Sequence, residues 1–399
     1  MSHPLPTTAA ATTPDGAVSR RHLLGAAGVT TGAAAFLHHT PRAVAAPADD
    51  KADDALDADG PLEWHSPRQD PFALIGFCWF DQDEVYRRLP VEPDWPLPAA
   101  VERLANNTAG GQIRFRTDST RVAVRVTLSG APSMNHMPAT GQCGFDVYVG
   151  DWGDQQYWGT AKPSLGKTEY EATFFTTPEP QSRTITLNFP LYQGVEKVEV
   201  GLDSGATTEA APDFELPGRL VVYGTSITQG GCASRPGTAY PAELSRRLAI
   251  ETVNLGFSGS GKGEQEVART IAQIDDVSCF VLDYESNVAT AADMKRTLSR
   301  FIPILRERHP QVPIVVVSKT PRIEERFDPD ALADRLAKRK AQADVVTRLQ
   351  RGGDEWLEFL DLGEHDLTAS SVDGVHLTDG GFTQLADLVE PSVRRWVSA

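Results

Sequence analysis

The pattern of apolar residues changes about halfway along the chain. Between residues 61 and 212, apolar side chains recur at every second position, as at Val122, Val124, Val126 and Leu128. A period of two indicates a strand with one buried face. The same alternation recurs at 112–117, 143–151, 170–176, 183–191 and 195–203, separated by Gly, Pro, Asp and Ser turns. This half predicts an antiparallel β-sandwich of jelly-roll type.

From residue 213 to residue 399, short apolar runs alternate with amphipathic helical stretches. Runs rather than alternations are typical of strands whose two faces are both covered, so they predict a parallel α/β sheet with right-handed crossovers. The expected strands are 219–224, 252–259, 279–284, 312–320 and 356–362. The expected helices are 239–250, 263–274, 292–309, 331–350 and 380–397.

The N-terminal 60 residues fit neither pattern. Arg20 and Arg21 precede a mildly apolar stretch, 23–37, and small residues follow at 43–45. This order predicts an export signal of the twin-arginine type over residues 1–45, and hence a secreted protein. The apolar stretch is shorter than the about 20 residues that a stable membrane span needs. Residues 46–60 are acidic and rich in Ala, which predicts a solvated linker.

Composition narrows the possible partners. The hydrophobic and charged fractions, 40% and 23%, are ordinary for a globular protein, and the formal net charge is -16. An acidic balance argues against nucleic acid or anionic lipid as the main partner, because phosphate binding needs a basic surface. The cysteines, Cys78, Cys143, Cys232 and Cys279, are widely spaced. Both a bridge and free thiols fit this spacing, which shows no C-x-x-C pair and no metal-type Cys/His cluster.

Candidate chemistry follows the predicted parallel strands. In parallel α/β sheets, functional residues gather in the loops at the carboxyl ends of the strands. Ser226 follows the first strand, Asn287 follows the third, and Asp373 and His376 follow the fifth. The end of the second strand carries the stretch "NLGFSGSG", with Asn254, Gly256, Gly259 and Gly261. A serine needs a base to become a nucleophile, and imidazole titrates near neutrality. A carboxylate orients that imidazole, and N–H groups stabilise the oxyanion.

Each of these residues also has a simpler interpretation. Ser226 fits a helix cap or turn, Asp373 and His376 fit a surface turn, and Asn287 fits a cap of the helix that follows it. The glycine-rich stretch 256–261 lacks the lysine of a P-loop. Ser258, Ser260 and Cys232 are alternative nucleophiles, but none follows directly on a strand where a sharp turn would expose it. The occurrence of all four candidate motifs at successive strand ends favours the catalytic interpretation.

This order of motifs resembles the SGNH (GDSL-like) hydrolase superfamily. The resemblance covers roughly residues 217–399 and implies a flavodoxin-like sheet. "GTSITQG" resembles the nucleophile block, with Ser226 as the serine, Thr225 in place of Asp and Ile227 in place of Leu. "NLGFSG" places Gly259 at the oxyanion glycine. In "ESNV", Asn287 matches the third block, whereas Glu285 and Val288 depart from it. The last block, D-x-x-H, is matched by Asp373 and His376.

The first half resembles the N-terminal β domain of one branch of these hydrolases. "GFDVYV" is similar to the Gly-x-Asp-Leu-Tyr signature, with Val147 in the Leu position, and "YRRLP" at 86–90 fits the same domain. Because alternate strand residues face opposite ways, Asp146 and Tyr148 face away from Phe145 and Val147. We expect Asp146 and Tyr148 to be structural.

Together these features predict a secreted serine esterase that needs no cofactor or metal. Ser226 is the expected nucleophile, His376 the base and Asp373 its orienting carboxylate. The resemblance implies an oxyanion hole made by the backbone of Ser226 and Gly259 and the side chain of Asn287. We expect an acylated small molecule or glycan as substrate, with acetyl esters of carbohydrates favoured.

Two alternatives remain open at this point. A lipase, phospholipase or thioesterase would need an apolar groove, to which Trp79, Phe80 and Trp152 are candidate contributors. A non-catalytic glycan-binding protein would use aromatic residues for stacking, and Trp152, Tyr157 and Trp158 are candidates for that role.

Overall fold

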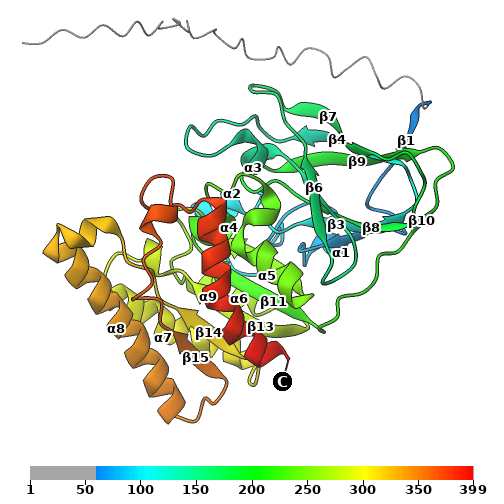
Figure 1. The fold of residues 1–399 in the computed structure, drawn as a ribbon. Coiled ribbons are helices and arrows are strands. Elements are labelled where there is room, and N and C mark those ends of the chain that lie inside the picture. Colours follow the sequence, from blue (N-terminus) through cyan, green and yellow to red (C-terminus); the bar gives the residue numbers. More distant parts are fainter. Residues whose placement is uncertain (1–59, 399) are drawn as a thin grey trace, which may run out of the picture. The chain divides into compact units, whose positions relative to one another are not determined.

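The computed structural model describes residues 60–398. The predicted export signal, and the linker up to residue 59, lie outside the described residues. Antiparallel sheets come first along the chain, and an α/β region follows them (Figure 1). Among residues 60–398, no helix combines the length and the apolarity that crossing a membrane requires.

The first half contains two antiparallel sheets, as the period-two pattern predicts. One sheet has the order β1-β9-β4-β7, and the other has the order β10-β3-β8-β5-β6 with β2 paired to β3. Their bounds are β1 Leu62–His65, β2 Ala73–Ile75, β3 Gln112–Thr117, β4 Arg121–Leu128, β5 Asp146–Val149, β6 Gln156–Thr160, β7 Glu169–Thr176, β8 Arg183–Asn188, β9 Val195–Asp203 and β10 Thr208–Glu209. The sequence pattern did not reveal the short strands β1, β2, β6 and β10, nor the short helices α1 Phe80–Asp83, α2 Ala99–Leu104 and α3 Ala139–Cys143.

The two sheets share one apolar core, which makes them a sandwich. Val122, Val124 and Val126 of β4 pack against residues of the second sheet such as Ile113 and Ile185, and all five are buried. Exposed Arg125 lies between two of these valines on the outer face of β4. The alternation read from the sequence is therefore the alternation between core and surface.

The second half is built on a five-stranded sheet in the order β12-β11-β13-β14-β15. All of its strand pairs are parallel. The strands are β11 Arg219–Gly224, β12 Glu251–Gly256, β13 Val277–Asp283, β14 Ile314–Val317 and β15 Leu357–Leu360. This order, with the first strand between the second and third, is flavodoxin-like and agrees with the predicted fold class.

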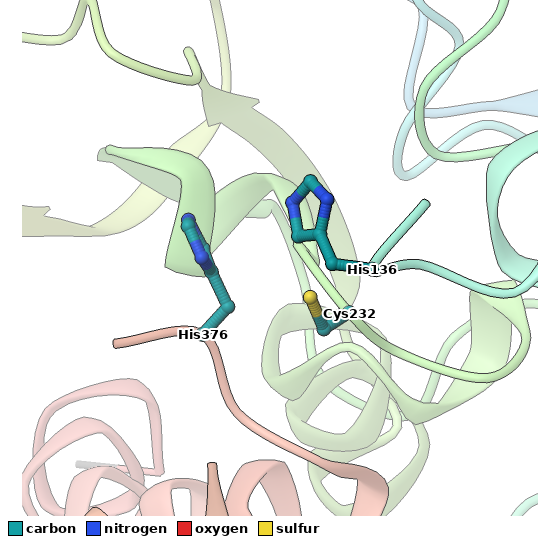
Figure 2. Close-up of side chains that lie close together, drawn as sticks. All are labelled: His136, Cys232 and His376. Atoms are coloured by element: carbon teal, nitrogen blue, oxygen red, sulfur yellow. The ribbon is translucent and has the colours of Figure 1, made fainter. Parts of the chain in front are cut away.

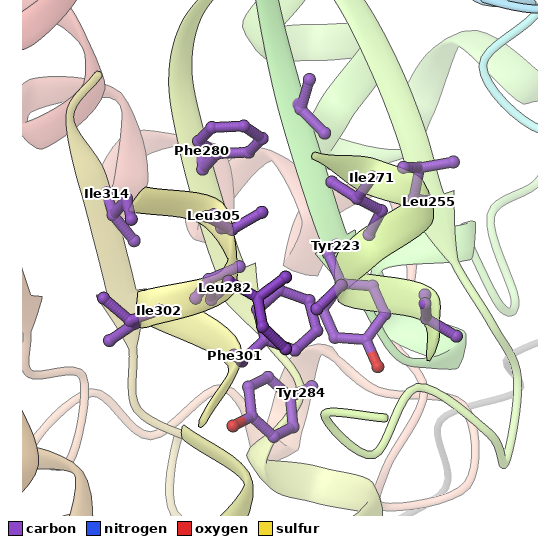
Figure 3. Packing of buried hydrophobic residues seen from close by; sticks show 14 of the residues in the cluster. Tyr223, Leu255, Ile271, Phe280, Leu282, Tyr284, Phe301, Ile302, Leu305 and Ile314 are labelled. Atoms are coloured by element: carbon purple, nitrogen blue, oxygen red, sulfur yellow. The ribbon is translucent and has the colours of Figure 1, made fainter. Parts of the chain in front are cut away.

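Helices cover both faces of this sheet. The longer ones are α5 Tyr240–Leu248, α6 Gln265–Ile271, α7 Ala291–Arg308, α8 Pro329–Arg351 and α9 Asp379–Val397. The helices α6, α7 and α8 pack on the face that carries Val221 and Tyr223, where Tyr223 stacks on Phe301 at a centroid distance of 4.8 Å (Figure 3). The helices α5 and α9 pack on the opposite face, which carries Leu220 and Val222. Burial on both faces explains why these strands read as continuous apolar runs.

Short elements complete this half, and side-chain caps begin several of its helices. The short helices are α4 Ser226–Gln229, η1 Pro236–Thr238, η2 Glu285–Asn287, η3 Ile323–Arg326 and η4 Thr368–Ser370. Thr290 begins α7 by accepting a hydrogen bond from the N–H of Asp293, and Thr378 begins α9 in the same way with Gly381. Such caps satisfy N–H groups that have no partner within the helix.

The two halves are joined by buried polar contacts. The guanidinium of Arg88, from the "YRRLP" segment, is fully buried and donates to the carbonyl oxygens of Gly256 at 2.5 Å and Asn254 at 3.3 Å. Asp146, also fully buried, accepts from the N–H of Gly237 at 2.8 Å and from Arg235 at 3.1 Å. The signature residues of the β domain therefore act as anchors for the α/β half.

All four cysteines are free thiols in the described residues. Cys143 lies in the sandwich core, whereas Cys232 and Cys279 lie in the core between the parallel sheet and α5 and α9. Burial raises the pKa of Cys78 to about 12 and that of Cys232 to about 11.

Candidate active site

Ser226 is the first residue of α4, directly after β11. Thr225, in the position before it, caps this helix by accepting a hydrogen bond from the N–H of Ile227 at 3.3 Å. The first N–H groups of a helix lack partners within it, and that of Ser226 is the first in α4. The helix ends after one turn at Gly230, whose φ of +105° favours glycine.

Asp373 and His376 lie in the loop before α9. The Asp373 carboxylate accepts from the backbone N–H of Val375 at 3.0 Å and of His376 at 2.8 Å. These bonds fold the loop back on itself, and Gly374 with a φ of +84° supplies the left-handed turn that this requires. The second carboxylate oxygen lies 2.7 Å from His376 Nδ1.

The structure brings Ser226, His376 and Asp373 into one chain of hydrogen bonds. His376 Nε2 lies 2.9 Å from Ser226 Oγ. Because an ionised carboxylate only accepts, Nδ1 carries the proton that faces Asp373, which leaves Nε2 to accept from the serine hydroxyl. Ser226 is 8% exposed, and the side chains of His376 and Asp373 are 22% and 36% exposed. The group is therefore accessible from solvent.

The environment keeps Asp373 ionised. Burial raises the pKa of this carboxyl, but the hydrogen bonds from the backbone and side chain of His376 and from Val375 outweigh that effect and lower the pKa to about 2. An ionised carboxylate beside Nδ1 fixes the tautomer of His376 and stabilises its protonated form.

Gly259 lies in the turn after β12, and its loop is tied to α4. Gln229 accepts from the N–H of Ser258 at 3.0 Å, and Asn254 donates to the carbonyl of Thr228 at 2.8 Å. Gly259 has a φ of +65°, and beyond its chain neighbours no atom lies within 4 Å of the point that a Cβ would occupy. The residue is exposed, and the turn leaves open space beside it.

Asn287 ends the short helix η2 after β13. Its side-chain amide donates to the carbonyl of Phe257 at 3.4 Å, which links it to the Gly259 loop. Glu285, where this sequence departs from the superfamily motif, is buried and accepts from the N–H of Lys319 and from Gln342, each at 2.7 Å. This departure thus has a structural role, because Glu285 anchors the turn that carries Asn287.

Two further residues contact the site: Tyr192, which carries no signal in the sequence, and Gly231, which directly follows the "GTSITQG" block. Tyr192, from the β half, donates to the backbone carbonyl of Ser226 at 3.2 Å. Gly231 donates to the same carbonyl at 2.7 Å and lies so close to His376 that a Cβ would approach its Cδ2 to 3.0 Å. Because the position of Tyr192 depends on how the two halves pack, periodicity and motif spacing could not reveal it, whereas Gly231 is a local neighbour of Ser226.

The alternative nucleophiles lie elsewhere in these loops. Ser258 is half-buried and Ser260 is buried in the turn around Gly259. Cys232 is buried near His376, and together with His136 these side chains form a His/Cys cluster that no sequence spacing indicated (Figure 2). The hydrogen bond to His376 distinguishes Ser226 from the other candidates.

Two cavities of the described residues have linings that do not include Ser226. A cavity of about 400 Å³ is lined by Cys78, Trp79 and Arg219. Arg219 begins β11, so this cavity lies at the amino end of the strand, whereas Ser226 follows its carboxyl end. Another cavity, of about 550 Å³, is lined by Tyr157, Ser234 and Arg235.

Comparisons with known proteins give a family match for each half of the chain. The sequence profile described as the GDSL-like lipase/acylhydrolase family matches residues 218–394. The profile described as the GxDLY N-terminus of SGNH-hydrolase-type esterases matches residues 62–208. No match was found among curated proteins.

Several solved structures share the fold. A protein described as a GDSL-like lipase from Bacteroides ovatus is 27% identical, with a TM-score of 0.76, over 84% of this chain and 98% of that chain. The salicylyl-acyltransferase SsfX3 from a tetracycline biosynthetic pathway is 22% identical, with a TM-score of 0.65, over 84% of this chain and 97% of that chain. A family two carbohydrate esterase from Clostridium thermocellum, in complex with cellohexaose, is 14% identical, with a TM-score of 0.53, over 72% of this chain and 92% of that chain.

The two profiles cover consecutive parts of the chain, in the order in which the structure places the sandwich and the α/β sheet. The chain therefore belongs to the SGNH (GDSL-like) hydrolases, in the branch with an N-terminal GxDLY domain, and is a carboxylic ester hydrolase.

Proposed function

We propose that this protein is a secreted serine esterase that removes acyl groups, chiefly acetyl, from carbohydrate through a triad of Ser226, His376 and Asp373. The observation that carries the proposal is the unbroken chain of hydrogen bonds from Ser226 Oγ through His376 to Asp373, with distances of 2.9 and 2.7 Å. These distances lie within the range that proton transfer between a nucleophile and its base requires.

In the first half of the reaction, Ser226 Oγ attacks the ester carbonyl while His376 Nε2 takes the hydroxyl proton. The tetrahedral intermediate collapses as His376 gives this proton to the departing alcohol, which leaves an acyl-serine. Water then attacks the acyl-serine with His376 again as base, and the carboxylic acid and the free enzyme result. Asp373 stays ionised throughout and stabilises the protonated imidazole.

The oxyanion that forms in each half-reaction needs preorganised donors. We assign the backbone N–H of Ser226, the N–H of Gly259 and the side-chain amide of Asn287 to this role. The contacts that tie α4 to the Gly259 loop, and that loop to Asn287, support this assignment.

Two features support a carbohydrate ester as substrate. The triad is partly exposed, which suits an acyl group that projects from a large polar molecule. The cavity of about 550 Å³ combines the half-exposed ring of Tyr157 with the polar side chains of Ser234 and Arg235. The backbone N–H of Ser234, in the lining of this cavity, donates to the side chain of Asp379, three residues after His376, at 2.8 Å. An aromatic ring among polar groups is a typical sugar-binding surface.

The aromatic residues considered for a long acyl groove are engaged elsewhere. Trp152 stacks on Phe214 at 4.7 Å, and Phe80 stacks on Tyr86 at 5.4 Å. Trp79 packs against the core of the parallel sheet. We therefore expect the highest kcat/KM for acetyl in a series of p-nitrophenyl esters from acetate to dodecanoate. A maximum at eight or more carbons would favour the lipase alternative instead.

The proposal includes an export signal at 1–45, a linker at 46–60, a sandwich domain at 61–212 and a hydrolase domain at 213–399. Arg20 and Arg21 carry the export assignment. Expression of the full chain in a host with a twin-arginine pathway tests it. We expect the host to export the active enzyme when it expresses the native chain. When it expresses the double variant Arg20→Lys, Arg21→Lys, we expect the activity to remain inside the cells.

The central experiment compares Ser226→Ala with Ser258→Ala in p-nitrophenyl acetate hydrolysis and in acetate release from acetylated xylan and cellulose acetate. We expect Ser226→Ala to lower kcat by about three orders of magnitude or more, because it removes the nucleophile. Ser258→Ala serves as the matched control and is expected to keep its activity. Undiminished turnover by Ser226→Ala would exclude Ser226 from the reaction.

A further inference from the structure

Three potential metal ligands from separate segments meet beside the catalytic histidine. His136 comes from the loop between β4 and α3, Cys232 from the turn after α4, and His376 from the loop before α9. One ligand atom from each residue lies within 4.8 Å of the other two. Figure 2 shows the three side chains coming together, and the two imidazole rings have a centroid distance of 5.8 Å.

We propose that His136, Cys232 and His376 form an inhibitory binding site for a thiophilic divalent cation such as Zn²⁺. The inhibition rests on the proposed esterase function, whereas the binding site does not. Imidazole nitrogen and thiolate sulfur are the ligands that Zn²⁺ prefers, and three protein ligands with one open position are a common zinc arrangement.

The geometry allows a cation to be bound with small side-chain movements. Bonds of about 2.0–2.3 Å place the ligand atoms of a tetrahedral zinc site roughly 3.3–3.8 Å apart. The ligand atoms must therefore approach one another by about 1 Å from separations of up to 4.8 Å. His136 is half-buried on an irregular segment, and its rotation can supply this movement.

A bound cation is incompatible with catalysis, because the lone pair of His376 that accepts the serine proton is also its metal-binding electron pair. Coordination through Nε2 replaces the hydrogen bond to Ser226, and coordination through Nδ1 replaces that to Asp373. In either case His376 no longer acts as an oriented base. Coordination by Cys232 forms a zinc–sulfur bond and releases the thiol proton to solvent.

Activity measurements on the full chain, freed of metal by chelation, test the inhibition. We expect Zn²⁺ to inhibit p-nitrophenyl acetate hydrolysis and excess EDTA to restore it, whereas Mg²⁺, which prefers oxygen ligands, has no effect. His136→Ala and Cys232→Ser are expected to keep the basal rate and to need at least tenfold more Zn²⁺ for half-inhibition. His365→Ala, which changes an exposed histidine outside the cluster, serves as the matched control and is expected to behave as the native protein.

A spectroscopic measurement tests the site without activity. Titration with Co²⁺ is expected to produce a thiolate-to-cobalt charge-transfer band that is absent in Cys232→Ser and weakened in His136→Ala. Cys78→Ser, which changes the half-buried thiol, is expected to retain the band. This band would appear even if the chain hydrolysed no ester, so the metal site and the esterase function can fail independently.

Two results would overturn the proposal. One is equal sensitivity to Zn²⁺ in the native protein, His136→Ala and Cys232→Ser. The other is a cobalt spectrum that is the same with and without Cys232. Near-ultraviolet circular dichroism of each variant establishes that it is folded.

Discussion

The Nε2 atom of His376 lies 2.9 Å from Ser226 Oγ, although 150 residues separate them along the chain. Asp373, in contrast, is only three residues from His376 and meets it within one folded loop. The pair of Asp373 and His376 is therefore set by local structure, whereas the contact with Ser226 depends on how the parallel sheet is assembled.

Asp373→Asn tests the orienting role of the carboxylate. The amide keeps the shape of the side chain but removes the charge that stabilises the protonated His376. We expect kcat to fall by about two to four orders of magnitude with a smaller change in KM. Steady-state kinetics on p-nitrophenyl acetate measure both, and an unchanged kcat would contradict the triad.

Asn287→Ala tests the proposed role of the Asn287 amide in the oxyanion hole. Loss of one such donor lowers kcat by about 10²–10³-fold. Asn287→Asp keeps the shape without the amide donor, and we expect it to be as slow as the alanine variant. An aspartate variant with native kcat would exclude the Asn287 amide from the oxyanion hole, because this variant has no side-chain donor.

Gly231→Ala tests the close packing around His376. The added Cβ would lie 2.8 Å from the Tyr192 hydroxyl and 3.0 Å from His376 Cδ2, so both side chains must give way. A displacement of about 1 Å costs roughly 100-fold in rate, so we expect a shift of a few tenths of an ångström to lower kcat by a smaller factor, about two- to tenfold. Gly380→Ala, where the nearest atom is 4.0 Å away, is the matched control and is expected to remain fully active.

Asp146→Ala tests the anchor between the sandwich and the α/β half. It leaves the N–H of Gly237, the Asn188 amide and the Arg235 guanidinium without their buried acceptor. We expect a loss of about 3–5 kcal/mol in the free energy of unfolding, measured by urea denaturation. Asp154→Ala, at an exposed position in the same half, is expected to change it little. Equal stability of the two variants would contradict the role of Asp146.

Asp283→Asn tests whether the free energy of unfolding depends on pH through Asp283, whose carboxyl group accepts a hydrogen bond from Thr228 of α4. Burial raises the pKa of Asp283 to about 7, and hydrogen bonds from Tyr240 and Thr228 oppose the shift only in part. Between about pH 4, the usual value for an unfolded Asp, and pH 7, the native state binds more protons than the unfolded state. The free energy of unfolding therefore falls as pH rises through this window.

We expect Asp283→Asn to lack this contribution, so that its stability relative to the native protein increases from pH 4 to pH 7. Urea denaturation at intervals across this range measures the difference. Asp275→Asn, at an exposed position, is the control and is expected to follow the native protein. A constant difference between Asp283→Asn and the native protein would contradict the raised pKa.

Several features follow from sequence alone, because they depend on short-range patterns. Val122, Val124 and Val126 alternate with outward-facing residues, and this marks β4 as a strand with one buried face. The apolar run 220–223 marks β11 as covered on both sides. Strands β1, β2, β6 and β10 escape detection because they are short and partly exposed, and pairing with longer neighbours stabilises them instead.

The features of the candidate site also divide into those that the sequence predicts and those that only the folded chain brings about. Ser226, Asn287, Asp373 and His376 were predicted from the sequence, since each follows a strand where parallel sheets collect functional loops. The resemblance to the SGNH hydrolases singled out Gly259 among the glycines near the end of β12. The 2.9 Å contact between Ser226 and His376, the support from Tyr192 and the approach of His136 to Cys232 exist only in the folded chain. Apolar periodicity and turn residues act over a few neighbours, whereas these contacts depend on the packing of segments far apart in sequence, which no local pattern encodes.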